Sequence, residues 1–221
     1  MLRIKVCGIT RKSDAEKAVE LGADALGFIF YPHSPRFIHP MDAWDIARKL
    51  PENITKVAVV VVPDPETVAF IKHDFNFDVL QIHGALTPEY LLCLRVYSIV
   101  PALQVGDDFS IDQIVKLKTS TGAFLLDTFK KGEYGGTGAS FDWSQAYKAK
   151  QHARIILAGG LNPENINKAV ETVKPYAVDL NSGVESSPGI KDHEKLQDIF
   201  HKLKEYRRDW QPDPPKAYPM A

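Results

Sequence analysis

The sequence predicts an α/β fold, a single-domain (β/α)8 barrel of the TIM type with parallel strands. Short apolar runs of four to eight residues recur along the chain, which is typical of strands buried on both faces of a parallel sheet. Segments with helical spacing separate them, and eight of each fit into 221 residues. The alternative is an open doubly wound sheet. Against it, the first run leads into Cys7-Gly8-Ile9-Thr10, with one glycine where a dinucleotide-binding fingerprint has three.

Eight apolar runs are assigned as the strands of the barrel. The fifth run is the least typical, because Pro101 cannot donate a hydrogen bond to a neighbouring strand. The predicted strands are Leu2–Val6, Ala25–Phe30, Lys56–Val62, Val79–His83, Tyr97–Leu103, Ala123–Asp127, Arg154–Ala158 and Ala177–Asn181.

The first helix has the clearest boundaries, because Ser13 and Glu16 fit a capping box and Gly22 fits a stop signal. Seven further helices are predicted at Asp42–Leu50, Pro65–His73, Thr87–Leu94, Ile111–Lys118, Asp142–Lys150, Pro163–Thr172 and Asp192–Arg208. These elements place the barrel in residues 1–208. Residues 209–221 are rich in proline and lack periodicity, so we expect a loosely ordered tail there.

The composition argues against several classes of function. A net charge of −1 provides no basic surface for nucleic acid or an acidic membrane. No apolar run approaches the roughly 20 residues that cross a bilayer, and the first residues do not resemble a signal peptide. The two cysteines, Cys7 and Cys93, lack zinc-binding or disulfide spacing, and Cys93 is expected on the buried face of a helix. We therefore expect a cytoplasmic protein without nucleic-acid or membrane partners.

Two glycine-containing loops predict a phosphate site. Gly159 and Gly160 follow the seventh expected strand, and Ser182 and Gly183 follow the eighth. In a closed barrel these loops are neighbours, and backbone amides of small residues there commonly bind a phosphate near a helix N-terminus. Tight strand-to-helix turns would also explain the glycines. Their presence in two adjacent loops favours a phosphorylated small-molecule substrate.

Two long loops also follow strand ends. Residues 128–141 are too many for a simple connector and fit either a mobile lid or a surface loop. In the loop from Tyr31 to Pro40, Arg36 lies between Pro35 and Phe37. A guanidinium held in this way suits bidentate contact with a carboxylate, although a solvated surface arginine fits the same pattern.

Three side chains are candidates for chemistry at the strand ends. Cys7 follows the first strand and is either a catalytic thiol or a small buried hydrophobe. Asp127 ends the sixth strand, where a carboxylate is costly unless it faces the barrel mouth and finds partners. His83 ends the fourth strand and fits either a substrate contact or a structural histidine. Cys7 and Asp127 together would be able to divide two proton transfers.

The motifs of the chain, taken in order, resemble those of the phosphoribosylanthranilate isomerases of tryptophan biosynthesis. The resemblance covers about residues 3 to 205 with the spacing of that family. It is carried by Lys5-Val6-Cys7-Gly8-Ile9-Thr10, Gly22–Phe30 with Ser34-Pro35-Arg36, Gln81-Ile82-His83-Gly84, Leu126-Asp127, Gly135-Gly136-Thr137-Gly138, Ala158-Gly159-Gly160-Leu161, Val178–Glu185 and Pro188–Asp192.

The resemblance implies a single-domain (β/α)8 barrel that works without metal or cofactor. The sequence itself leaves the oligomeric state open between a monomer and a homodimer. The implied reaction is the Amadori rearrangement of N-(5-phosphoribosyl)anthranilate, with Asp127 as the acid and Cys7 as the base. Arg36 would bind the anthranilate carboxylate, His83 would contact substrate, and the amides of Gly159, Gly160, Ser182 and Gly183 would bind the phosphate.

Other functions remain as alternatives. A barrel that binds a phosphoribosyl ligand without converting it would need the phosphate loops and Arg36, but not both Cys7 and Asp127. The sugar-phosphate isomerase of histidine biosynthesis would have an aspartate where this chain has Cys7. An indole-glycerol-phosphate synthase would use catalytic lysines and an N-terminal extension, and an aldolase would have a lysine in place of Asp127.

Overall fold

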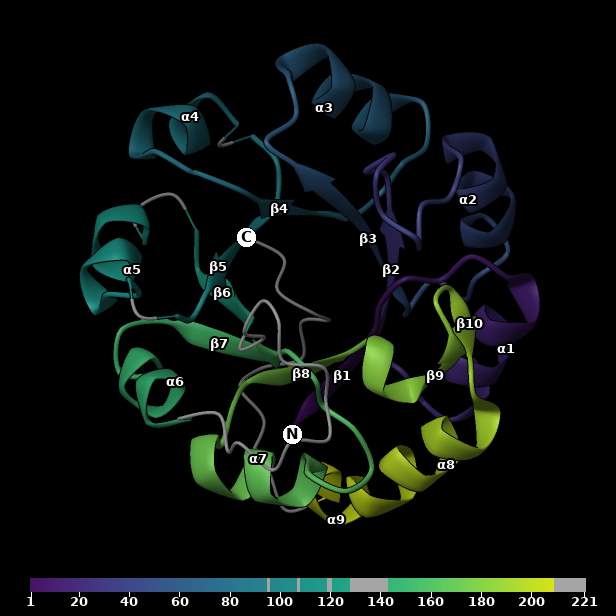
Figure 1. Cartoon of the computed structure of the whole chain (residues 1–221). Helices are drawn as coiled ribbons and strands as arrows, with labels where there is room; N and C mark the ends of the chain where they lie inside the picture. Colours follow the sequence, from purple (N-terminus) through teal and green to yellow (C-terminus); the bar gives the residue numbers. More distant parts are fainter. Residues whose placement is uncertain (95, 107, 119–120, 128–142, 209–221) are drawn as a thin grey trace.

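Eight parallel strands close on themselves in chain order, with β8 pairing back to β1 (Figure 1). The computed structural model describes residues 1–94, 96–106, 108–118, 121–127 and 143–208. The strands are β1 (Arg3–Val6), β2 (Ala25–Ile29), β3 (Thr55–Val61), β4 (Val79–His83), β5 (Ile99–Gln104), β6 (Ala123–Asp127), β7 (Arg154–Ala158) and β8 (Ala177–Leu180). The predicted barrel is therefore confirmed, including β5, which accommodates Pro101 opposite Ile82.

Helices surround the ring of strands, as Figure 1 shows. They are α1 (Lys12–Glu20), α2 (Pro40–Ala47), α3 (Pro65–His73), α4 (Pro88–Cys93), α5 (Ile111–Leu117), α6 (Ser144–Ala149), α7 (Ile166–Val173), α8 (His193–Lys202) and α9 (Lys204–Arg208). The last predicted helix is thus two helices. Between β8 and α8 the chain also forms a 3-10 turn, η1 (Ser182–Val184), and an antiparallel hairpin of β9 (Glu185–Ser187) and β10 (Ile190–Lys191), none of which was predicted.

The capping box predicted for the first helix is wrong. Helix α1 begins at Lys12, its N-cap residue is Arg11, and no side chain caps it. Ser13 therefore lies inside the first turn, too late to act as the cap. The neighbouring Asp14 instead accepts hydrogen bonds from the backbone N–H of Lys191 (3.0 Å) and from His193 Nε2 (2.9 Å), which ties α1 to the hairpin.

Side chains alternate between the two faces of each strand, and this divides the apolar residues into two layers. On β1, Ile4 and Val6 belong to the large layer between strands and helices, whereas Cys7 belongs to the layer inside the barrel. The inner layer is filled by Val57, Val59, Val79, Val100, Leu125 and Ile156, among others. The barrel interior is therefore packed, and polar groups inside it require a specific explanation.

Cys93 was expected in the core, but it is exposed. Helix α4 is short and buries Leu91, and Leu94 just beyond it, so the intervening Cys93 faces solvent. Within the described residues, no helix is long and apolar enough to cross a membrane. The predicted lid at 128–141 and the predicted tail at 209–221 lie outside the described residues.

Candidate active site

Three of the candidate side chains lie at the carboxyl ends of barrel strands, which in a parallel barrel share one mouth. Cys7 follows β1, His83 ends β4 and Asp127 ends β6. The Asp127 residue pairs in register with Gln104 of β5 and Ala158 of β7, and its side chain is half-buried. The thiol and the carboxylate therefore border the mouth from opposite parts of the strand ring.

Cys7 is buried, with 4% of its surface exposed, and its backbone N–H donates to the carbonyl of Leu180 at 2.8 Å. The space for its side chain depends on Gly27 of β2. A methyl group at position 27 would lie 2.8 Å from Cys7 Sγ and 3.0 Å from Lys5 Nζ, which is closer than side-chain atoms normally approach. Glycine at this position therefore makes room for both the thiol and the lysine.

Lys5 lies two residues before Cys7 and so points to the same inner face of the barrel. It is fully buried, and its Nζ donates to Asp179 Oδ2 of β8 at 2.8 Å. Burial alone would lower the pKa of Lys5, but the charges of Asp179 and Cys7 more than offset that effect and raise it. Burial raises the pKa of the Asp179 carboxyl group as well, against the opposing charge of Lys5, so the two groups form a buried, mutually dependent ion pair.

Neither Lys5 nor Asp179 was predicted as a site residue. A signal was available, since a lysine in the centre of an apolar first strand is unusual unless it has a buried partner. The partner lies 174 residues later in the chain. Only closure of the barrel through the pairing of β1 with β8 brings the two together, with Lys5 and Asp179 in register.

The thiol has a raised pKa in this environment. Burial raises the pKa of Cys7, and the Asp179 carboxylate raises it further. The positive charges of Lys5 and Lys191 act in the opposite direction. The reactivity of Cys7 therefore depends on the balance between these neighbouring charges.

His83 is also governed by burial. Burial and the positive charge of Lys5 lower the pKa of His83 to about 4, so the imidazole is neutral near pH 7. Its Nε2 lies 3.0 Å from Nε2 of Gln81. This contact holds the imidazole against the Gln81 side chain. A neutral imidazole of this kind can donate to a substrate oxygen.

Arg36, the predicted carboxylate clamp, is brought to the same mouth. A side chain at Gly8 would meet Arg36 Cδ at 3.0 Å and Asn181 Oδ1 at 2.7 Å, so Arg36 borders the residue after Cys7. Its guanidinium is already engaged on one side. Arg36 Nε donates to both carboxylate oxygens of Glu185 at 2.9 and 3.0 Å, and Nη2 donates to Oε2 at 2.7 Å.

Glu185 in turn joins Arg36 to Lys191. Glu185 and Lys191 lie on the β9–β10 hairpin, and neither was predicted as a site residue. Lys191 Nζ donates to Glu185 Oε1 at 2.9 Å and to Asn181 Oδ1 at 3.1 Å. Burial alone would raise the pKa of Glu185, but the hydrogen bonds from Arg36 and the charge of Lys191 lower it. Glu185 is therefore a carboxylate that fixes the orientation of Arg36.

The two predicted phosphate loops lie against each other. A methyl group at Gly183 would lie 2.0 Å from the carbonyl oxygen of Leu161, so the loop after β8 contacts the loop after β7 through its backbone. Gly159 and Gly160 both have positive φ, and the Gly160 carbonyl accepts a hydrogen bond from Asn165 Nδ2 at 3.0 Å. The two loops that hold the four predicted phosphate residues therefore lie side by side at the ends of the paired strands β7 and β8.

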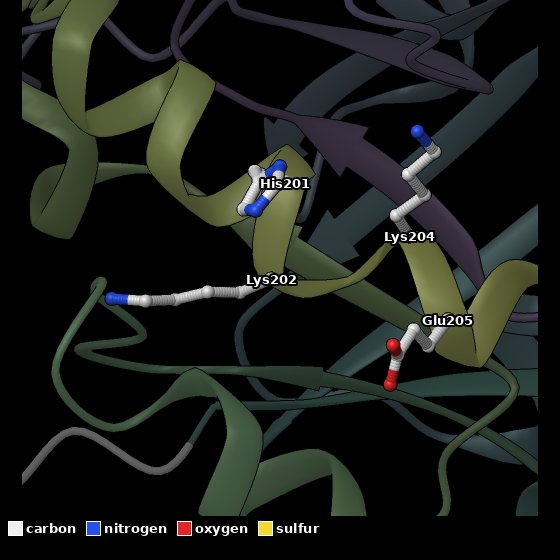
Figure 2. A pocket seen from close by; sticks show the side chains of 4 residues that line it. All are labelled: His201, Lys202, Lys204 and Glu205. Carbon is white, nitrogen blue, oxygen red and sulfur yellow. The ribbon is translucent and has the colours of Figure 1, made fainter.

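A separate hollow of about 420 Å³ lies at the ends of α8 and α9, away from these residues. Figure 2 shows that its four side chains, His201, Lys202, Lys204 and Glu205, diverge and do not converge on a common point. Lys202 is engaged with Asp198 and with the carbonyl of Pro163. In the part of the chain that the structure describes, no group of three or more His, Cys, Asp or Glu side chains is placed to hold a metal ion.

Comparison with known proteins places the chain among enzymes. Residues 4–202 match the family model described as N-(5'phosphoribosyl)anthranilate (PRA) isomerase. The chain is 44% identical over 207 residues to the N-(5'-phosphoribosyl)anthranilate isomerase of Syntrophus aciditrophicus, covering 94% of this chain and 89% of the relative.

Solved structures of such isomerases are similar to the whole barrel. The phosphoribosylanthranilate isomerase of Thermotoga maritima has a TM-score of 0.85 and 38% identity, covering 93% of this chain and 100% of its own. An isomerase in complex with reduced 1-(o-carboxyphenylamino)-1-deoxyribulose 5-phosphate has a TM-score of 0.82 and 35% identity at the same coverage. A third structure, also with a TM-score of 0.82, 34% identity and the same coverage, is of monomers generated from the dimeric isomerase of Thermotoga maritima.

Proposed function

This chain belongs to the N-(5'-phosphoribosyl)anthranilate isomerase family, and from that membership we propose how its residues divide the work of the reaction. The activity is the isomerisation of N-(5'-phosphoribosyl)anthranilate to 1-(2-carboxyphenylamino)-1-deoxyribulose 5-phosphate, a step of tryptophan biosynthesis. The rearrangement needs an acid to open the sugar ring and a base to remove a proton from carbon. Asp127 is the proposed acid and Cys7 the proposed base.

The acid step opens the furanose ring. Asp127 gives a proton to the ring oxygen, the bond from C1 to that oxygen breaks, and the lone pair of the aniline nitrogen forms an iminium with C1. The position of Asp127 at the end of β6, half-buried at the mouth, supports this role because the carboxyl group can reach a bound sugar.

The base step moves a proton from carbon. The thiolate of Cys7 takes the proton from C2 of the opened sugar, and the electrons of that bond form a C1–C2 double bond while the iminium electrons return to nitrogen. The resulting enolamine tautomerises to the ketone as C1 gains a proton and the C2 hydroxyl loses one. Cys7 is suited to this step because it lies at the mouth and has a lysine ammonium beside it.

Three further groups would bind the substrate. The part of the Arg36 guanidinium not occupied by Glu185 would bind the anthranilate carboxylate. Neutral His83 would donate to the sugar, and the amides of Gly159, Gly160, Ser182 and Gly183 would bind the phosphate. The relative in complex with a reduced product analogue supports a phosphorylated small molecule as the ligand of this site.

The observation that carries the assignment is the placement of Cys7 and Asp127 at two strand ends of one barrel mouth. We expect Cys7→Ala and Asp127→Asn each to lower turnover by about 10² to 10⁴ or more. Both should bind the reduced product analogue within about tenfold of the unchanged protein, since each removes a proton-transfer group and not a binding group.

Turnover is measured by the loss of fluorescence of phosphoribosylanthranilate generated in situ, and analogue binding by calorimetry. Cys93→Ser is the matched control, because it removes the exposed thiol of α4 and should leave the rate unchanged. Near-normal rates in Cys7→Ala or Asp127→Asn would overturn the acid and base assignment. Equal loss of binding and turnover would instead assign these residues to substrate binding.

We propose the cellular compartment and the oligomeric state on the same basis. The protein acts in the cytoplasm without a metal or other cofactor, and as a monomer or a homodimer. The dimeric isomerase of Thermotoga maritima supports the homodimer. Sedimentation of the purified chain distinguishes the two states.

A further inference from the structure

Lys5 and Asp179 form a charge pair inside the barrel that the proposed acid and base steps do not use. We propose that Lys5 is a positioning residue that holds its ammonium group against the Cys7 thiolate, and that Asp179 limits how strongly this ammonium stabilises the thiolate. The inference rests on the proposed role of Cys7 as the base. It adds two residues that determine how much of Cys7 is in the thiolate form that a base requires.

The geometry places the ammonium and the sulfur in one small space. Both side chains extend from β1 to the inside of the barrel, and both would collide with a methyl group at Gly27, Sγ at 2.8 Å and Nζ at 3.0 Å. Because both atoms lie that close to one point, the ammonium and the sulfur are neighbours. Since Lys5 is fully buried, water does not screen its charge from the sulfur.

The charges that face the thiol come from three elements. Lys5 lies on β1, Asp179 on β8 and Lys191 on β10, whereas β2 contributes only Gly27. Lys191 is already engaged by Glu185 and Asn181, and Arg36, beside Gly8, is engaged by Glu185. Lys5 therefore differs from the other two cations, because its ammonium is hydrogen-bonded to Asp179 and lies beside the thiol in the space at Gly27.

Asp179 is incompletely bonded. Its Oδ2 accepts from Lys5, while its Oδ1 is buried and has no hydrogen-bond partner among the described residues. A carboxylate in this state holds the ammonium in place and at the same time competes with the thiolate for it. Loss of Lys5 should therefore raise the pKa of the thiol, and loss of Asp179 should lower it. A purely structural ion pair would not give these opposite shifts.

The test is a thiol titration in a Cys93→Ser background, which leaves Cys7 as the one cysteine of the chain. The rate of alkylation by iodoacetamide is measured against pH, together with the pH dependence of kcat/KM. Lys5→Met should raise the thiol pKa by about 1 to 3 pH units, and Asp179→Asn should lower it, as expected for loss of a nearby opposite or like charge. Lys5→Arg keeps the positive charge, so its thiol pKa should lie between that of Lys5→Met and that of the unchanged protein.

Arg3→Met is the matched control. Arg3 lies on the same strand and is paired with Asp24, but two residues further from the thiol than Lys5. This variant should leave the thiol titration unchanged. Should Lys5→Met fail to fold, Asp179→Asn and Lys5→Arg still decide the matter. A thiol pKa that does not fall in Asp179→Asn, or that moves equally in Arg3→Met, overturns the proposal.

The alkylation assay separates this proposal from the assignment of Cys7 as the base. If Cys7→Ala is inactive while the thiol titration is the same in all Lys5 and Asp179 variants, Cys7 remains the base and the role of Lys5 is wrong. If Cys7→Ala keeps its activity, the base assignment fails whatever the titration shows.

Discussion

Two clusters of charge lie next to Cys7, and they are built differently. The interior pair, Lys5 and Asp179, is buried inside the barrel and leaves one carboxylate oxygen without a partner among the described residues. The rim network, Arg36, Glu185 and Lys191, lies at the mouth, and its carboxylate accepts from both cations and from the backbone N–H of Gly189.

The difference indicates a division of labour. A carboxylate with all of its acceptor sites used fixes the geometry of its partners, as Glu185 does for Arg36. In the interior pair, one acceptor oxygen is unused and the ammonium lies beside a titratable thiol. The hydrogen bonds of this pair can therefore change when the charge of the thiol changes. The rim network is therefore suited to holding Arg36 in place, and the interior pair to setting the charge of the Cys7 thiol, the proposed base.

The largest expected effect comes from breaking the interior pair on one side. Lys5→Met leaves Asp179 as a buried carboxylate without its cation, and should cost about 3 to 5 kcal/mol in the free energy of unfolding. Lys5→Met combined with Asp179→Leu removes both charges and should recover most of that loss. Urea unfolding of the two variants measures the difference. Equal destabilisation of both would mean that the pair matters through packing and not through charge.

A second prediction uses His83, whose pKa is lowered by burial and, to a smaller extent, by the charge of Lys5. Because the pKa of His83 is about 4 when folded and near 6.5 when unfolded, the unfolded chain binds the proton first. Stability should fall as the pH drops from about 6.5 towards 4, by roughly 3 kcal/mol from this residue. His83→Gln removes this contribution, so urea unfolding of both proteins at pH 7 and pH 4.5 measures it. The same pH dependence in both would contradict the low pKa.

The smallest effect is expected from loosening the rim network. Glu185→Gln weakens the clamp that orients Arg36. It should raise KM by about tenfold with a smaller change in kcat, since the proposed role of Arg36 is to bind the substrate carboxylate and not the reacting carbons. Steady-state kinetics measure both constants. Arg48→Gln, which removes an exposed pair with Asp45, is the control and should leave KM unchanged. A loss confined to kcat would place Glu185 in the chemical step.

The alternation of apolar runs and helical segments predicted the barrel correctly because each strand of a parallel barrel is covered on both faces. The β9–β10 hairpin was missed, since its short strands carry no period of their own. The prediction for Cys93 was wrong because a helix as short as α4 buries only one side. The spacing of its few apolar residues fits two faces nearly equally well.

The sequence by itself determined the fold class, the family and the side chains at the strand ends, since these follow from local pattern and from motifs in order. Only the tertiary structure decided which charges meet. Lys5 and Asp179 are 174 residues apart, and Arg36 and Glu185 are 149 residues apart. Both contacts depend on the closure of β8 against β1, which sets a buried carboxylate beside the ammonium and so governs the thiol of Cys7.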